Sequence, residues 1–305
     1  MRMFFAGAED KKIREILKKC GVTRILISYY YIKQKKINFE ELFADFPEIV
    51  LDSGAFTMFK KRPTKEESAK YFADYIKFIE QHVGNFFFVA NYDVDVFMGY
   101  KQIDTWNKEF FPFEKAGQRV CYVAHDFDAR HIRLYEYLQS FGYVGVSYVK
   151  SNQTQKEHVE TLTGVAYTIA LKNKSHIHGF GMTSFVSNSR APFYSVDSTT
   201  YLGGAKYGTT YVYNGAFFET WTYHYKYRRK GLVGQARAYG MDEETIKKFV
   251  DDTDINAVTE FNIYSWKESE KHFNLRLLQR QWWLTDKERE QITKKEYMCP
   301  LHIKS

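Results

Sequence analysis

The sequence has few cysteines, and it lacks both a long hydrophobic run and a recognisable secretion signal. Its three cysteines, Cys20, Cys121 and Cys299, are odd in number and widely spaced. This excludes a disulfide framework and favours a reducing compartment. No apolar run approaches the roughly 18 residues that a membrane-spanning helix needs, and the apolar stretch within residues 1–10 is too short for a signal peptide. We therefore expect a soluble, cytoplasmic protein.

The chain also lacks an internal repeat, a low-complexity tract and a proline-rich linker, and it contains only five prolines in 305 residues. This length suits one large barrel or two ordinary domains, and the missing linker favours the barrel. The 24 tyrosines and 26 phenylalanines can fill a large core and can also stack on bases. The formal net charge of +7 is compatible with an anionic partner such as nucleic acid.

Short β-branched and aromatic segments alternate with helical segments along the first two thirds of the chain. Strands separated in this way indicate βαβ units and a parallel sheet. Six strands up to residue 180, a seventh from residue 193 and a further possible strand at residues 2–6 favour the α/β class and a (β/α)8 TIM barrel. No Gly-x-Gly-x-x-Gly follows the first strand, which counts against a dinucleotide-binding fold. The expected strands are residues 2–6, 24–31, 48–51, 85–90, 119–124, 143–147, 177–181 and 193–196, and the expected helices are residues 10–19, 102–115, 129–139 and 156–172.

The clearest helix of the sequence begins after Thr64. Glu67 follows Thr64 three residues later, which is the spacing of a capping box. Apolar residues then recur at helical spacing, at Tyr71, Phe72, Tyr75, Ile76, Phe78 and Ile79.

We expect two regions in the chain. Residues 1–215 form the barrel and the catalytic core, and residues 216–305 form a helical, aromatic-rich extension that packs on it. Helices are expected at residues 241–250 and 256–283. Residues 210–213 either close the barrel or belong to an insertion.

Polar residues follow or end most of the expected strands. The C-terminal ends of the strands of a (β/α)8 barrel open on one face, where active sites are built. Carboxylates that gather there can act as nucleophile and general acid/base, or they can bind a divalent metal. The strand ends in question are Asp52-Ser53-Gly54, Asp93 with Asp95, His125-Asp126, Gly145-Val146-Ser147, residues 179–183 and Asp197-Ser198.

Asp197 is the first candidate for a nucleophile or base. The alternative is that its carboxylate caps the next helix or turn. The recurrence of acids at the same position on four strands favours a chemical role over capping. For His178, within an apolar strand, we expect a structural role with local hydrogen bonds.

Four of these segments together resemble the tRNA-guanine transglycosylase family. Residues 51–56 (Leu-Asp-Ser-Gly-Ala-Phe) are similar to its Asp-Ser-Gly-Gly-Phe-Gln element, and residues 91–93 (Asn-Tyr-Asp) to its Ala-Phe-Asp. Residues 179–183 (Gly-Phe-Gly-Met-Thr) resemble its Gly-Val-Gly-Thr-Pro. Residues 194–198 (Tyr-Ser-Val-Asp-Ser) stand where the family has Phe-Asp-Cys-Val followed by Pro-Thr-Arg. The order and spacing match over residues 24–210.

The resemblance implies base exchange at an N-glycosidic bond. Asp197 would be the nucleophile at C1′ of the sugar and would hold a covalent glycosyl intermediate while the bases are exchanged. Asp52 would be the general acid/base, Asp93 would hydrogen-bond the guanine edge, and backbone groups of residues 145–147 would line the base pocket. The substrate-binding residues that the resemblance implies are Ser53, Gly54, Phe56, Asp93, His125, Asp126, Gly145, Val146, Ser147, Gly179 and Gly181.

The sequence departs from the family at three points. The family's zinc motif, Cys-x-Cys-x-x-Cys with a distant His, is absent, and Cys299 and His302 alone do not make a zinc site. We therefore expect no metal and no cofactor. The family's Pro-Thr-Arg is replaced by residues 199–201 (Thr-Thr-Tyr), and its Gln-Gly by His125-Asp126. These departures indicate a divergent branch that places a free 7-deazaguanine base into nucleic acid, DNA in preference to tRNA. Since family members are often dimers, a homodimer is possible.

Two basic segments are candidates for nucleic-acid contact. The first, within residues 219–230, interleaves aromatic and basic side chains that would stack on bases and neutralise phosphates. Its alternative role is that of an amphipathic edge or helix with a solvated basic face. The second segment follows the Asp-Ser-Gly element on the loop side of the barrel. The residues concerned are Tyr225, Lys226, Tyr227, Arg228, Arg229 and Lys230 in the first segment, and Lys60, Lys61 and Arg62 in the second.

Two other functions remain open at this stage. The same acids can bind a metal in a barrel hydrolase or lyase that acts on a small phosphorylated substrate. The chain can also be a nucleic-acid-binding module without catalytic activity. Sensitivity to a chelator separates the first alternative from the transglycosylase, and replacement of Asp197 separates the second.

Overall fold

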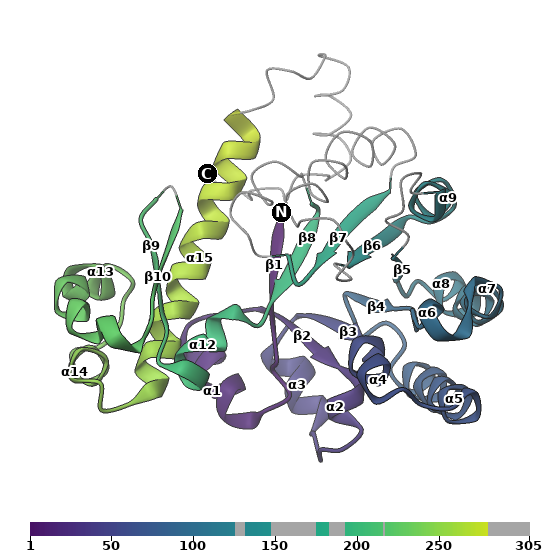
Figure 1. Cartoon of the computed structure of the whole chain (residues 1–305), viewed down its shortest axis with the longest axis horizontal. Coiled ribbons are helices and arrows are strands. Elements are labelled where there is room, and N and C mark those ends of the chain that lie inside the picture. Colours follow the sequence, from purple (N-terminus) through teal and green to yellow (C-terminus); the bar gives the residue numbers. More distant parts are fainter. Residues whose placement is uncertain (126–131, 148–174, 183–192, 216, 280–305) are drawn as a thin grey trace.

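Eight parallel strands form a closed barrel in the order β1 to β8 (Figure 1). The computed structural model describes residues 1–125, 132–147, 175–182, 193–215 and 217–279. With helices around this barrel, the expected (β/α)8 fold is confirmed. The strands are β1 (Arg2–Ala6), β2 (Arg24–Ser28), β3 (Glu48–Asp52), β4 (Phe88–Ala90), β5 (Val120–Ala124), β6 (Tyr143–Ser147), β7 (His176–Phe180) and β8 (Ser195–Ser198).

The helices that follow the first five strands pack on the outside of the barrel. They are α1 (Lys11–Lys19), α2 (Tyr29–Ile32), α3 (Phe39–Asp45), α4 (Ala55–Lys61), α5 (Lys65–Gln81), α6 (Asp95–Met98), α7 (Tyr100–Asn107), the 3-10 helix η1 (Lys108–Phe110), α8 (Phe111–Lys115) and α9 (Ile132–Ser140). The helix expected at residues 156–172 lies outside the described residues.

The capping box predicted for α5 is confirmed. The Thr64 hydroxyl accepts a hydrogen bond from the Glu67 backbone N–H at 3.1 Å, and the Glu67 carboxylate accepts one from the Thr64 N–H at 2.7 Å. The stripe that follows is buried at Tyr71, Phe72, Tyr75 and Ile79. A local signal in the sequence therefore determines where this helix begins and which face it buries.

Two expected elements are divided in the structure. The strand predicted for residues 24–31 ends at Ser28, and Tyr29 begins α2. The Tyr29 ring packs on Tyr71 and Tyr75 of α5, with ring centroids 5.3 and 5.0 Å apart, so the aromatic run leaves the sheet. The helix predicted for residues 102–115 is divided because Pro112 stands in the first turn of α8, where its missing N–H costs no hydrogen bond.

Apolar side chains fill both the inside of the barrel and the layer between strands and helices. The inner cluster includes one residue from each of the first six strands, namely Phe4, Leu26, Val50, Phe88, Cys121 and Tyr143. Alternate residues of the same strands, such as Phe5, Ile25 and Leu51, face the outer layer. Burial on both faces explains why the strands are continuous apolar runs in the sequence.

The barrel closes between β1 and β8, where Phe4 is the register partner of Asp197. Residues 2–6, expected as a possible strand, are therefore the first barrel strand. The strand β9 (Thr210–Tyr213) pairs antiparallel with β10 (Phe218–Trp221) in a separate two-stranded sheet. Of the two alternatives for residues 210–213, the structure thus has the insertion outside the barrel.

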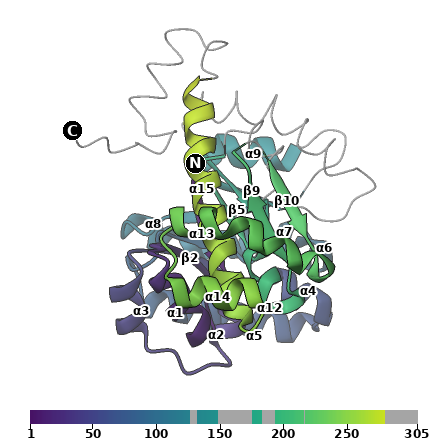
Figure 2. The ribbon, with the colours of Figure 1, turned by 90° about the vertical axis from the view of Figure 1, so that its left-hand side faces the viewer.

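The elements after β8 gather on one side of the barrel (Figure 1), and Figure 2 shows them facing the viewer. They are the 3-10 helix η2 (Thr200–Leu202), α12 (Gly203–Tyr207), β9, β10, the 3-10 helix η3 (Tyr223–Leu232), α13 (Val233–Ala238), α14 (Glu243–Asp251) and α15 (Ile255–Gln279). They have a core of their own, which includes Val212, Phe249 and Phe261. Ile263 and Trp266 of α15 belong instead to the outer core of the barrel.

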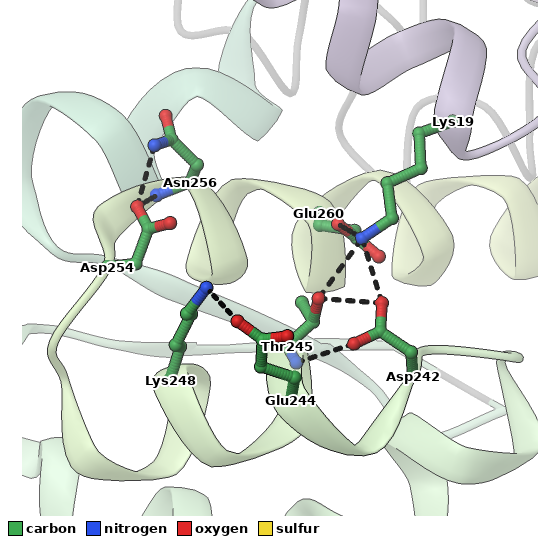
Figure 3. Close-up of polar contacts among 8 residues, drawn as sticks. All are labelled: Lys19, Asp242, Glu244, Thr245, Lys248, Asp254, Asn256 and Glu260. Carbon is green, nitrogen blue, oxygen red and sulfur yellow. Dashed lines mark hydrogen bonds and ion pairs between the residues drawn. The ribbon is translucent and has the colours of Figure 1, made fainter.

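Polar contacts join this side to α1 and to the first two strands. The ammonium of Lys19 lies 3.0 Å from Asp242, 3.1 Å from Thr245 and 2.9 Å from Glu260 (Figure 3). The Glu270 carboxylate of α15 accepts two hydrogen bonds from Arg24 at 2.8 Å. The C-terminal elements therefore pack directly on the barrel. Within the described part of the chain, no helix has both the length and the apolar character to cross a membrane.

Candidate active site at the strand ends

Ionisable side chains from four strands or the loops that follow them lie at the C-terminal end of the barrel. Asp52 ends β3, Asp93 follows β4, His125 follows β5, and Asp197 lies in β8. Since all eight strands are parallel, these positions share one face of the barrel. As expected, the strand ends bring these four residues together. Asp126 lies outside the described part of the chain.

Asp197 is the third residue of β8 and not, as expected, a residue that follows the strand. It faces the barrel interior, because it is the register partner of Phe4, and only 7% of its surface is exposed. Its Oδ1 accepts a hydrogen bond from the Gly181 N–H at 2.9 Å and lies 3.3 Å from Nε2 of His178. No described residue donates a hydrogen bond to its other oxygen, Oδ2.

The capping role considered for Asp197 belongs to its neighbour. The hydroxyl of Ser198 accepts a hydrogen bond from the Thr200 N–H at 2.9 Å, where η2 begins. The Asp197 carboxylate points the opposite way, toward β7. The structure therefore contradicts the capping alternative, since a side chain within β8 that faces the interior does not reach the N–H groups of η2.

His178 is the residue whose position the sequence did not reveal. It is fully buried in β7, with Nδ1 2.7 Å from the Ser195 hydroxyl and Nε2 facing Asp197. The expected local hydrogen bonds are present, but one partner is the candidate nucleophile. The only signal in the sequence was that both residues are polar and stand in or directly after an expected apolar strand; the face of each is known from the strand register.

Asp52 has a carboxyl group that titrates near neutral pH. Its Oδ2 accepts a hydrogen bond from the Gly54 N–H at 3.0 Å. Burial raises the pKa of Asp52 to about 7, and repulsion by the carboxylates of Asp93 and Asp197 adds to the rise, against the opposing effects of Ser28 and Gly54. Asp52 thus senses the charge of Asp197 and holds a proton that it can give or take at neutral pH.

Glycine is the only residue type that fits at position 54, in the turn beside Asp52. Its φ is +82°, and a Cβ atom at this position would lie 2.5 Å from Cβ of Tyr30. The turn leads from β3 directly into α4, and Tyr71 donates a hydrogen bond to the Ser53 carbonyl at 2.7 Å. The Asp-Ser-Gly segment is therefore fixed from both sides.

His125 joins the two acids that follow β4. Its Nε2 lies 2.9 Å from Oδ2 of Asp93, and its Nδ1 lies 2.7 Å from Oδ1 of Asp95. Burial alone would lower the pKa of His125, but the two carboxylates outweigh it and raise the pKa to about 10. The ring is an imidazolium at neutral pH. Asp93 is accordingly oriented by His125, with the Ser53 hydroxyl 3.5 Å from its other oxygen.

The remaining substrate-binding candidates lie at different depths. Gly145 faces the interior beneath Phe180, since a Cβ there would lie 2.6 Å from that ring. Val146 packs in the outer core, so its side chain cannot line the barrel interior and only its backbone remains available. Gly179 contacts Met182 on its outer side, whereas Gly181 reaches Asp197 through its N–H. Ser147 ends β6 beside Phe180.

Aromatic and basic side chains are exposed on α4, directly after the Asp-Ser-Gly turn. The Phe56 ring is 66% exposed, and the ammonium of Lys60 lies 4.2 Å from its centroid. Lys61 lies over the Tyr30 ring at 5.0 Å, and Arg62 ends the helix. We call Phe56, Lys60, Lys61 and Arg62 the α4 cluster. It presents one flat ring and three cations beside β3.

The second basic segment forms η3, and its residues differ in exposure. Tyr225 and Tyr227 are exposed, with the Arg228 guanidinium 4.8 Å from the Tyr225 ring. Lys226 lies 3.2 Å from Asp252, and Lys230 is exposed.

Arg229 has to be removed from the predicted nucleic-acid surface. It is 1% exposed, and its guanidinium contacts Asp252, the Thr210 hydroxyl at 2.9 Å and the Gly208 carbonyl at 2.8 Å. A buried guanidinium that is hydrogen-bonded inside the protein cannot reach a phosphate at the surface. Arg229 instead connects η3 to β9 and to the end of α14.

Among the described residues, no group of three or more His, Cys, Asp or Glu side chains is arranged to hold a metal ion. The histidine that follows β5, His125, already has a carboxylate on each ring nitrogen. Cys299 and His302 lie outside the described part of the chain.

No protein-family model and no curated protein matches this chain. A (β/α)8 barrel by itself hosts many chemistries, so its function has to be argued from the site. Three features carry that argument: a buried aspartate with one oxygen that no described residue binds, a neighbouring acid with a pKa near 7, and an exposed aromatic and basic surface on α4.

Proposed function

We propose that the protein is a transglycosylase that exchanges guanine in nucleic acid for a free 7-deazaguanine base through a covalent intermediate on Asp197. The observation that carries this proposal is the pairing of Asp197 with Asp52. One is a carboxylate with a single oxygen held by Gly181 and His178. The other is an acid whose pKa of about 7 partly reflects the charge of the first.

The two acids suit the two halves of a double displacement. In the first half, Oδ2 of Asp197 attacks C1′ of the sugar, the bond from C1′ to the base nitrogen breaks, and its electron pair goes to the base. Asp52 gives its proton to the departing base. In the second half, Asp52 removes a proton from the incoming base. That base attacks C1′, and the carboxylate of Asp197 is released.

Asp93 and His125 suit recognition of the base. Guanine and 7-deazaguanine both carry N–H groups on one edge, and a carboxylate can accept hydrogen bonds from them. Because His125 holds one oxygen of Asp93, the orientation of the carboxylate is set before the base arrives. We therefore propose that Asp93 reads the guanine-like edge.

The α4 cluster suits a nucleic acid whose base has left the stack. Chemistry on a base requires extrusion from a duplex, and exposed rings stabilise unstacked bases. Phe56 offers such a ring next to the Asp52 turn, and Lys60, Lys61 and Arg62 can neutralise phosphates. Together with the replacement of the family's Pro-Thr-Arg and Gln-Gly segments, this favours DNA over tRNA as the substrate.

A trapping assay tests the proposal. The protein is incubated with guanine-containing duplex DNA, or with tRNA, with and without a free 7-deazaguanine base, and a denaturation-resistant adduct is sought. We expect an adduct with DNA that Asp197→Asn abolishes. Asp74→Asn, which changes an exposed aspartate of α5 paired with Lys33, is the matched control and should leave the adduct unchanged.

The other outcomes discriminate between functions. An adduct with tRNA alone would keep the chemistry and correct the polymer. Absence of adduct and of base exchange with both polymers would overturn the proposal. In that case, activity on a phosphorylated small molecule that a chelator abolishes would establish the metal-dependent alternative, and DNA binding without turnover would establish the binding module.

A further inference from the structure

The last two strands of the barrel carry a chain of three hydrogen-bonding side chains that faces inward. Ser195 and Asp197 lie two residues apart on β8 and therefore share one face. His178 on β7 is the register partner of Ser195. The histidine ring lies between them, 2.7 Å from the Ser195 hydroxyl and 3.3 Å from Oδ1 of Asp197. All three are buried in the protein.

The partners of the ring determine which nitrogen carries its proton. A carboxylate oxygen can only accept, so Nε2 of His178 donates to Asp197. Phenylalanine rings surround the imidazole, with Phe88 4.9 Å and Phe180 4.4 Å between centroids. In the neutral ring Nδ1 is an acceptor, and the Ser195 hydroxyl donates to it.

We propose that His178 is a positioning residue for Asp197, which it holds by Oδ1 so that Oδ2 is presented to the sugar. Ser195 supports this role from behind, because its hydroxyl can donate to the unprotonated Nδ1 while Nε2 keeps its proton for Asp197. The Gly181 N–H is the second donor to Oδ1. This inference rests on the proposed function of Asp197 as the nucleophile.

The arrangement acts differently on the two halves of the reaction. When Oδ2 forms its bond to C1′, Oδ1 becomes the carbonyl oxygen of an ester and carries less charge. When that bond breaks again, negative charge returns to both oxygens, and the two donors to Oδ1 stabilise it. His178 therefore assists release of the carboxylate more than attack by it.

A matched pair of variants tests the role. Glutamine and methionine have similar size, but only the side chain of His178→Gln can donate a hydrogen bond from the position of Nε2. We expect His178→Met to lower base exchange about 100-fold, as misplacement of a reacting group does, and His178→Gln to recover about tenfold of this loss. In His178→Met the fraction of enzyme trapped as adduct during exchange should rise, because release is slowed more than attack.

A merely structural role predicts different results. Loss of packing alone would lower adduct and exchange together, and it would favour Met over Gln, since Gln brings a buried amide into apolar surroundings. The inference is overturned if Gln is no more active than Met, or if the trapped fraction falls in step with exchange. Unfolding midpoints of both variants rank their stability. A positioning role is supported if His178→Gln is the more active variant although His178→Met is the more stable one.

A second measurement is independent of any substrate. Nitrogen-15 NMR of histidine-labelled protein, with the His178 signals identified by their loss in His178→Gln, reports which ring nitrogen is protonated. We expect a proton on Nε2 alone in the wild type, and again on Nε2 in Ser195→Ala, since Asp197 still accepts from it. A proton on Nδ1, or on both nitrogens, would overturn the inference even if exchange is found. The expected tautomer without exchange in the wild type would overturn the proposed function instead.

Discussion

Nε2 of His125 lies 2.9 Å from Oδ2 of Asp93, and this contact fixes the orientation of the acid that follows β4. The other ring nitrogen contacts Asp95, at the start of α6. An imidazolium between two carboxylates links the ends of β4 and β5 and keeps two like charges close together. The same contact therefore bears on the stability of the fold and on the geometry of the site.

Replacement of His125 should reveal this link as a pH-dependent loss of stability. Since the pKa of His125 rises from about 6.5 in the unfolded chain to about 10 in the folded protein, its stabilisation is complete below pH 6.5 and is lost as the pH rises through 10. We expect His125→Gln to lower the free energy of unfolding by about 3 kcal/mol at pH 6. Urea unfolding from pH 6 to 11 measures the difference, which should shrink toward zero above pH 10. His224→Gln, at an exposed histidine, is the control, and a difference independent of pH would contradict the assignment.

The rate of adduct formation should report the proton of Asp52. A general acid has to be protonated, so the single-turnover rate without free base should be constant at low pH and fall as the pH rises through about 7. Asp52→Asn should remove this falling limb of the pH–rate profile and lower the rate about 10² to 10⁴-fold.

The neighbour Asp93 offers a sharper version of the same test. Its carboxylate raises the pKa of Asp52 by repulsion, so Asp93→Asn should move the limb to lower pH. Asp74→Asn on α5 should leave the limb unchanged. A limb that stays in place in Asp93→Asn would show that another group titrates.

The α4 cluster should contribute phosphate contacts to DNA binding. Each phosphate contact that is lost reduces the slope of log K against log salt by about 0.9 on duplex DNA. We expect a reduction of about 1.8 for the double variant Lys60→Gln with Lys61→Gln, measured by fluorescence anisotropy at several salt concentrations. The double variant Lys77→Gln with Lys115→Gln changes the net charge equally at two other exposed lysines, so equal slopes in the two variants would refute a local contact.

Lys19 should stabilise the packing of the C-terminal elements on the barrel. Its ammonium is half-exposed, but its partner Glu260 is buried, and the carboxylate would be left unpaired in Lys19→Met. We expect a loss of about 1–2 kcal/mol in urea unfolding. The adjacent Lys18→Met, whose ion pair with Asp45 is more exposed, should change the stability by less than about 0.5 kcal/mol. Adding Glu260→Gln to Lys19→Met should recover part of the loss. A double variant that is no more stable than Lys19→Met alone would contradict this explanation.

Much of the barrel could be predicted because its signals are local. The β-branched and aromatic runs, the helices between them and the Thr64 capping box are patterns of near neighbours, and they indicate the strands, their order and the burial of both faces. The acids at the strand ends could be predicted for the same reason, since polar residues interrupt apolar runs there. What such patterns miss is the place where a run leaves the sheet, as Tyr29 does when it packs on α5.

The sequence by itself determined the class of fold and the set of ionisable residues at one end of the barrel. Only the tertiary structure decided how those residues are paired: that Asp197 lies within β8 and not after it, that His178 faces it, that His125 holds Asp93, and that Arg229 is buried. Each of these contacts joins residues that are distant in the sequence. They depend on strand register and on closure of the barrel between β1 and β8, and a shift by one residue would turn a side chain to the opposite face.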